Sequence, residues 1–390
     1  MTPAARVQAA IEILGPVLRG EAAERALTRW ARASRFAGSG DRAAVRDHVF
    51  DALRRLRSAA WAGGLGDADP VAMEARAVMR GLLVGQGADA DALFDGSRHG
   101  PARWDGPDTP AAAPPRAVRL DVPDWTLRLF DAALGPRADA VCLALRDRAP
   151  VHLRANAART DRDGVVAALR DDGYDAHPHP AASTAVEVRG APRGLQAHAL
   201  FRDGLFEFQD AGSQALVEAL PLVDGMRVLD LCAGGGGKAL AMAARSDLHV
   251  TAHDADPARM RDLPERARRA RAPIAVELDP RGPFDLVVCD VPCSGSGSWR
   301  RAPEAKWRLT PDALDALMAT QAAILDRADA LAGPRGAIAY MTCSLFTAEN
   351  GVAAGAVGRL GRRATGAVTL TPLDGTDGFH MTQLGPRTDA

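Results

Sequence analysis

Two cysteines in the last third of the chain have sequence contexts that suggest thiol chemistry. Cys293 ends an Asp-Val-Pro-Cys run that begins at Asp290, and Cys343 lies in a Thr-Cys-Ser run. Each follows a short apolar segment of strand type, residues 284–289 and 336–341. Side chains just past the carboxyl ends of strands line the ligand crevice of an open α/β sheet. A thiolate is a strong nucleophile and a second thiol can carry a proton, so we expect both cysteines in one active site.

The remaining cysteines favour a reduced protein without a metal site. The chain has five cysteines, and no two have the CxxC spacing of a zinc site or a thioredoxin-type pair. An odd number in a long chain does not suggest a disulfide framework. Cys142 lies in a helical pattern and Cys289 in a strand-like run, so we expect both to be small buried hydrophobic residues.

Composition indicates an ordinary globular protein of two or three domains. The chain has 390 residues, of which 47% are hydrophobic. Its net charge of −1 does not by itself indicate a nucleic-acid-binding protein. No apolar run of about 18 residues is present, so we expect no membrane span. The first residues lack a basic-then-apolar signal pattern. Together with the reduced cysteines, this predicts a cytoplasmic protein.

The chain uses arginine almost to the exclusion of lysine. Of its 48 basic residues only Lys238 and Lys306 are lysines, and both lie in the motifs described below. This hints that a compact ammonium is needed there and that a guanidinium would not serve, with chance as the alternative.

The pattern of apolar, glycine and proline residues along the chain predicts an α/β protein with three parts. Residues 1–118 read as a helical domain that ends in a linker rich in glycine and proline. Residues 119–204 are predicted to form linker helices and a small α/β module that binds RNA. Residues 205–390 alternate strand and helix, which is typical of a parallel, Rossmann-like sheet. We expect a fragment that starts near residue 119 to fold and bind cofactor.

A glycine loop follows the first strand of that last domain. Residues 227–231 form an apolar strand, and the loop after it comprises Cys232, Ala233, Gly234, Gly235, Gly236, Gly237 and Lys238. It fits neither the Walker A pattern nor the GxGxxG fingerprint. A second strand ends in Asp254, where an acid can accept hydrogen bonds from ribose hydroxyls. The glycine loop and Asp254 together indicate a cofactor that contains a nucleoside but no phosphate. S-adenosylmethionine matches this description better than NAD does. The alternative is a generic glycine turn with a surface aspartate.

The segment after Cys293 mixes glycine, serine, tryptophan and arginine. It contains Trp299, Arg300 and Arg301, followed by Lys306 and Trp307. Such a mixture suits an aromatic and cationic platform for a base and phosphates. The alternative is a solvated loop with tryptophan half buried.

These motifs, in this order, resemble the RsmB-type ribosomal RNA cytosine-5 methyltransferases of the RsmB/NOP family. The resemblance covers residues 205–390. It is carried by residues 208–214, 230–238, 254, 290–297, 306–307, 342–344, 349–350 and 377–379. The helical N-terminal region is similar, on residues 38–47, to the NusB-like RNA-binding domain of such enzymes. The glycine loop departs from the family pattern Cys-Ala-Ala-Pro-Gly-Gly-Lys-Thr, because glycines replace its second alanine and its proline and Ala239 replaces its threonine.

The resemblance implies a Rossmann-like S-adenosylmethionine-dependent domain that methylates cytosine C5 in small-subunit (16S) ribosomal RNA. It makes Cys343 the nucleophile, with Cys293 assisting release and Asp290 and Lys238 completing the catalytic set. Asp290 would also belong to the cofactor site, with residues 232–238, Asp254, and Asp279 at the adenine. From the residues alone either thiol can be the nucleophile, since DNA cytosine-5 methyltransferases use a Pro-Cys cysteine.

Two other functions stay open at this point. One is a methyltransferase of the same group that acts on transfer RNA or large-subunit RNA. The other is a noncatalytic RNA-binding assembly factor. In each case we expect a monomer that binds RNA and needs neither a metal nor a membrane.

Overall fold

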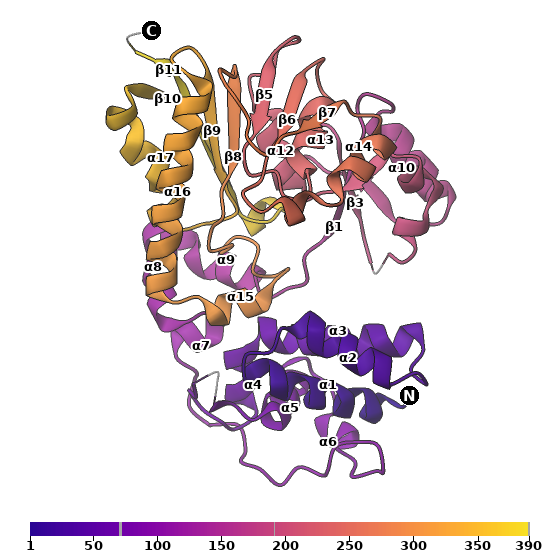
Figure 1. Ribbon diagram of the computed structural model, residues 1–390. Helices are drawn as coiled ribbons and strands as arrows, with labels where there is room; N and C mark the ends of the chain where they lie inside the picture. Colours follow the sequence, from indigo (N-terminus) through magenta and orange to yellow (C-terminus); the bar gives the residue numbers. More distant parts are fainter. Residues whose placement is uncertain (70–71, 191, 389–390) are drawn as a thin grey trace. The chain divides into compact units, whose positions relative to one another are not determined.

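The computed structural model describes residues 1–69, 72–190 and 192–388 (Figure 1). The chain separates into two compact units. The first comprises Met1–Arg148 with Trp299–Leu309, and the second comprises Ala149–Ser298 with Thr310–Ala390. In the described part of the chain, no helix has the length and apolar character needed to cross a membrane.

The first unit is helical. The Thr2 hydroxyl caps its first helix, and apolar residues such as Val7, Leu14, Val49 and Leu82 fill its core. Its helices are α1 (Pro3–Leu18), α2 (Ala23–Ala33), α3 (Ser39–Arg54), α4 (Leu56–Ala62), α5 (Ala75–Gly85), α6 (Ala90–Leu93), α7 (Arg116–Leu120), α8 (Asp124–Leu134), α9 (Ala138–Ala144) and α15 (Pro303–Arg308).

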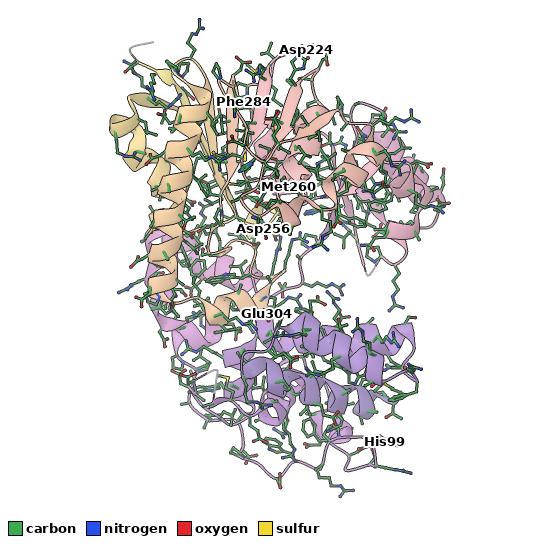
Figure 2. The ribbon with its side chains drawn as sticks, viewed as in Figure 1. His99, Asp224, Asp256, Met260, Phe284 and Glu304 are labelled. Carbon is green, nitrogen blue, oxygen red and sulfur yellow. The ribbon has the colours of Figure 1, made fainter. Side chains whose placement is uncertain are left out.

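The segment 299–309, which includes α15, packs among the N-terminal helices although it follows the Cys293 loop in sequence. The Lys306 ammonium donates to the Arg54 carbonyl at 3.1 Å, and the Trp307 indole donates to the Leu53 carbonyl at 2.7 Å. Glu304, labelled in Figure 2, accepts a hydrogen bond from the Ala23 amide. The segment is thereby fastened to α2 and α3.

The prediction of an exposed RNA platform in this segment is wrong for three of its residues. Trp299, Arg300 and Lys306 are at most 5% exposed, and the Trp299 ring packs edge-on against Phe130. Local composition suggested a nucleic-acid surface, but these side chains fill the interior of the helical unit instead.

The second unit begins with a small antiparallel sheet of order β2-β3-β1-β4. Val165, Val166 and Leu169 of its main helix pack on the sheet. Its elements are β1 (Val151–Ala155), α10 (Arg162–Asp171), β2 (Ala176–Pro178), β3 (Ala185–Val188), α11 (Ala199–Arg202) and β4 (Phe206–Phe208). The strand at Phe206–Phe208 therefore pairs with β1, and the parallel sheet starts later, at Arg227.

A seven-stranded sheet of order β10-β11-β9-β8-β5-β6-β7 forms the rest of the second unit (Figure 1). β5 to β9 run parallel, whereas β10 and β11 are antiparallel, which confirms the expected Rossmann-like domain. The elements are α12 (Ala211–Glu218), β5 (Arg227–Asp230), α13 (Gly237–Ala243), β6 (His249–Ala252), α14 (Leu263–Ala270), β7 (Ile274–Val276), β8 (Leu286–Asp290), α16 (Pro311–Ala332), β9 (Ala337–Thr342), α17 (Thr347–Leu360), β10 (Arg362–Leu370) and β11 (Phe379–Arg387).

Helices cover both faces of this sheet. Val228 points to the core shared with α12, α13 and α14, and the next residue, Leu229, points to the core shared with α16 and α17. The strand order reverses at β5, which has β6 on one side and β8 on the other. Ligands of open α/β sheets bind at such a switch point, beyond the carboxyl ends of the strands.

Candidate active site

A crevice of about 330 Å³ opens at this switch point, between the ends of β5 and β8. The glycine loop forms one wall. Gly234 and Gly236 have φ values of 49° and 78°, which an L side chain rarely adopts, and a Cβ on Gly236 would lie 2.2 Å from the Leu263 side chain. Residues of the loop in the lining are Cys232, Ala233, Gly234, Gly235, Gly237 and Lys238.

Asp254 fastens the end of β6 to the glycine loop. One carboxylate oxygen accepts from the Gly234 amide at 2.9 Å, and the other accepts from the Asp256 amide at 3.0 Å. Arg259 pairs with the same carboxylate at 3.2 Å. Asp256 and Met260, both labelled in Figure 2, belong to the turn that carries this arginine. Asp254 is 3% exposed and is not among the residues that line the crevice, so its contact with a ribose stays a prediction.

Lys238 and Asp290 meet across the crevice. The ammonium of Lys238, on α13, lies 2.6 Å from a carboxylate oxygen of Asp290, at the end of β8. Burial opposes the charge on Lys238, but the attraction of Asp290 outweighs it, so the pKa of Lys238 is raised. The pair leaves a fixed positive charge beside a carboxylate that is 36% exposed and can contact a ligand.

Asp230, at the end of β5, is a crevice residue that the sequence interpretation did not assign. It is 1% exposed, and neither oxygen has a well-formed hydrogen bond. Burial, followed by the charge of Asp290, raises its pKa to about 7. The Ala239 and Cys232 amides and the charge of Lys238 offset part of that rise. A ligand that brings its own positive charge or N–H groups would offset more of it. Its position at a strand end before the glycines was the available signal.

The two thiols predicted to act together lie in contact. The sulfur atoms of Cys293 and Cys343 are 3.3 Å apart, and both residues are half buried. Either sulfur can donate in this contact, and the contact lowers the pKa of Cys343. Ser298 and Lys238 also favour the Cys343 thiolate, against burial and the charge of Asp290. The pKa of Cys293 is raised well above its ordinary value, first because of the same bond.

A buried carboxylate joins the two cysteine loops. Glu349, on α17, is fully buried and accepts from the Ser294 amide at 2.8 Å, from the Ser294 hydroxyl at 2.5 Å and from the Ser344 hydroxyl at 2.5 Å. Gln321 of α16 donates to it at 2.9 Å. Ser294 and Ser344 directly follow Cys293 and Cys343, so one side chain holds the loops after β8 and β9 together.

Other residues differ in how close they come to the crevice. Asp279 is 81% exposed and is not among the crevice residues, so its contact with adenine stays a prediction.

Burial raises the pKa of Cys142 and of Cys232 to about 12 and that of Cys289 well above its ordinary value, which makes all three inert. Phe208, Gln209, Ser213 and Phe379 also line the crevice, and the motifs that contain them carried no predicted role.

The residues present fit S-adenosylmethionine. The glycine loop gives backbone access, Asp254 lies at the end of the second strand, and Asp230 supplies a buried carboxyl group for a cationic ligand. Three basic residues line the crevice, and each has a partner among the described residues: Lys238 pairs with Asp290, Arg259 pairs with Asp254, and Arg266 donates to the Gly235 carbonyl and to Glu207.

Comparison with known proteins finds similarity to ribosomal RNA methyltransferases. Residues 217–383 match the family model "16S rRNA methyltransferase RsmB/F", and residues 122–193 match the ferredoxin-like domain of RsmF/B-like methyltransferases. Ribosomal RNA small subunit methyltransferase B of Xanthomonas campestris pv. campestris is 34% identical over 240 residues, which are 58% of this chain and 55% of that protein. Its counterpart in Vibrio vulnificus is 32% identical over 58% of this chain and 56% of that protein. The match thus spans about half the length of these relatives.

Solved structures show the same fold. PH0851 superposes with a TM-score of 0.76 at 19% identity, covering 99% of both chains. A methyltransferase homologue from Pyrococcus horikoshii gives 0.61 at 23% identity, covering 70% of this chain and 97% of that one. With both domain models matched, the chain belongs to the RsmB/F family of S-adenosylmethionine-dependent methyltransferases.

Proposed function

We propose that this protein methylates C5 of a cytosine in small-subunit ribosomal RNA, through a covalent bond between Cys343 and C6 of the base. The observation that carries the proposal is the contact between two thiols, 3.3 Å apart, which lowers the pKa of Cys343 and raises that of Cys293. Neither thiol lines the crevice, but Asp290 and Lys238, which do, act electrostatically on Cys343. The small-subunit target is taken from the names of the relatives. The proposed setting is cytoplasmic.

The chemical difficulty is that C5 of cytosine is a poor nucleophile. Addition of the Cys343 thiolate to C6 breaks the C5–C6 double bond and places electron density on C5. Asp290 would contact the cytosine edge near N3 and help to offset charge on the ring. The bound S-adenosylmethionine supplies an electrophilic methyl group.

Release of the product requires two further bonds to break. The C5 proton leaves, and the pair of electrons from that bond restores the double bond as the Cys343 thiolate departs from C6. Cys293 takes this proton as a general base. While Cys343 is bonded to C6 it no longer competes with Cys293 for a proton, so Cys293 can act as a thiolate. The base must first be unstacked from the RNA to reach the thiols.

Bisulfite sequencing of ribosomal RNA tests the function directly. A deletion strain should lose one protected cytosine in small-subunit RNA, and the intact gene should restore it. Loss of a cytosine mark in transfer RNA or large-subunit RNA would favour the second candidate substrate. An unchanged map, with no S-adenosylmethionine binding by titration, would favour a noncatalytic assembly factor.

A further inference from the structure

Helix α2 and the turn after it present a row of arginines to solvent. Arg25, Thr28, Arg32 and Arg35 recur at intervals of three or four residues and are all exposed. The other side of the helix, which includes Leu27, packs into the core of the helical unit. We call the exposed set, Arg25, Thr28, Arg29, Arg32, Arg35 and Arg42, the α2 arginine face.

Two adjoining hollows run along this face. One, of about 410 Å³, is lined by Glu24, Arg25, Thr28, Arg29 and Arg32. The other, of about 540 Å³, is lined by Thr28, Ala31, Arg32, Arg35 and Arg42 and by no acidic residue. Since they share Thr28 and Arg32, they form one continuous trough.

Part of the positive charge of this face is not neutralised. Arg29 pairs with Glu21, and Glu24 pairs with Arg46 outside the face. Arg32 and Arg35 have no ion-pair or hydrogen-bond partner among the residues that the structure describes. Two adjacent guanidinium groups are therefore free to take an anionic ligand.

Charge is also unevenly divided along the chain. The helical unit has 25 basic and 20 acidic residues, whereas the second unit has 23 and 29. Residues 19–46 alone contain seven arginines and three acids. The excess of the helical unit is thus concentrated around α2, although the whole chain has a net charge of −1.

An exposed aromatic ring adjoins the free arginines. Phe36 follows Arg35 and is 77% exposed. Bases of single-stranded nucleic acid stack on such rings while neighbouring cations hold the phosphates. A protein partner would need a larger apolar patch in the centre of its interface than this one side chain offers.

We propose that the α2 arginine face binds a single-stranded segment of the substrate RNA, with Arg32 and Arg35 on phosphates and Phe36 stacked on a base. The proposal rests on the proposed function only in taking RNA as the macromolecule bound.

The test compares two double charge reversals in the full chain. Arg32→Glu with Arg35→Glu alters the face, while Arg98→Glu with Arg128→Glu makes the same charge change at exposed positions elsewhere in the helical unit. Binding of a protein-free transcript of small-subunit ribosomal RNA is measured across a salt series. We expect the first pair to weaken binding at least tenfold and to reduce the slope of log K against log salt by about 1.4, or about 0.7 for each phosphate that the protein no longer holds. The control pair should stay within threefold.

Phe36→Ala gives a second readout, because it removes stacking without changing charge. It should weaken RNA binding about fivefold and leave the salt slope unchanged. Equal losses for the two charge-reversed pairs would overturn the proposal, since the effect would then be one of net charge. The proposal would also be overturned if the variant with Arg32→Glu and Arg35→Glu bound the transcript fully but no longer bound the assembled small subunit. That result would indicate that the face binds an acidic protein.

Failure of this proposal can be told apart from failure of the proposed function. RNA binding is measured without turnover, so a chain that binds through α2 but leaves cytosine unmethylated overturns the function alone. A variant with Arg32→Glu and Arg35→Glu that binds like the wild type overturns the α2 proposal alone.

Discussion

At the residue scale, the contact between two sulfur atoms shifts the pKa values of the two thiols in opposite directions. It lowers the pKa of Cys343 and raises that of Cys293, which favours Cys343 as the thiolate. Cys343→Ala should therefore abolish both activity and the covalent species. Cys293→Ala should still attack and transfer the methyl group, and then stall. Denaturing electrophoresis of protein mixed with substrate RNA and S-adenosylmethionine should show a stable complex for Cys293→Ala only.

The two changes remove the same atoms, so each controls for the other. Loss of packing would affect both variants in a similar way and could not produce opposite results. A stable complex with Cys343→Ala and none with Cys293→Ala would mean that Cys293 is the nucleophile.

Asp254 carries the cofactor prediction at this scale. Its carboxylate is buried and contacts the Gly234 amide and Arg259, and we predict that it also accepts hydrogen bonds from ribose hydroxyls. Asp254→Ala should weaken S-adenosylmethionine binding by about 1.5–3 kcal/mol in calorimetric titration. Asp247→Ala, at an exposed acid of the same unit, should leave the dissociation constant unchanged. An unchanged constant for Asp254→Ala would remove this residue from the cofactor site.

Single residues at strand ends were predictable from the sequence, and residues whose burial depends on chain folding were not. Asp290, Asp254 and Cys343 each follow an apolar run, and parallel strands bring such positions to one edge. Lys306 shows the converse. The sequence motif suggested that Lys306 belongs to the active site, but this residue is 2% exposed and lies in the helical unit. Of the two lysines, Lys238 is the one that lines the crevice.

At the element scale, Glu349 sets the distance between the loops after β8 and β9. Glu349→Gln keeps the size of the side chain but turns one of two accepting oxygens into an NH2 donor. One oxygen of Glu349 accepts from both serine hydroxyls and the other accepts from the Ser294 amide and Gln321, so either orientation of the glutamine loses two hydrogen bonds. A displacement of about 1 Å between the sulfurs can cost about a hundredfold in rate. We expect a loss of that order in kcat, with the dissociation constant for S-adenosylmethionine unchanged.

Oxidative linkage of the thiols reports the same distance without turnover. Diamide should join Cys293 to Cys343 more slowly in Glu349→Gln than in the wild type. The control is Asp329→Asn. Asp329 lies on α16, and its buried carboxylate pairs with Arg362 and Arg387. It should lower stability but keep the linkage rate. Wild-type linkage in Glu349→Gln would show that the glutamate does not position the loops.

The anchoring of α15 has a pH signature. Burial lowers the pKa of Lys306 to about 8, so its charged form costs folding free energy at neutral pH. The unfolded chain binds this proton up to its ordinary pKa of about 10.4. Between these values the unfolded state binds more protons, and stability rises with pH. The wild type should therefore gain up to about 3 kcal/mol of unfolding free energy relative to Lys306→Met from pH 8 to pH 10.5.

Urea denaturation at several pH values measures that difference. Because both proteins share every other titrating group, the comparison isolates Lys306. A pH-independent difference between them would show that this lysine is not buried as a charged group.

At the scale of the whole molecule, one segment is separated from its neighbours in sequence. Residues 299–309 follow the Cys293 loop but fold with the N-terminal helices. Periodicity predicts the helices and strands on either side of this segment. It cannot predict which hydrophobic core residues 299–309 pack against, because that depends on residues distant in sequence, such as Leu53 and Ala23. The expectation that a fragment starting near residue 119 folds independently therefore needs correction, because that fragment lacks α2 and α3.

The fragment that follows from the structure starts at Ala149 and has residues 299–309 replaced by a glycine–serine linker. It retains both sheets and their cores, so it should be monodisperse, melt cooperatively and bind S-adenosylmethionine. The same fragment with the native segment should aggregate, because Trp299 and Lys306 lose the helices that bury them. Size-exclusion chromatography and thermal denaturation compare the two. A fragment with the native segment that is as soluble and stable as the linker version would show that residues 299–309 need no partner in the helical unit.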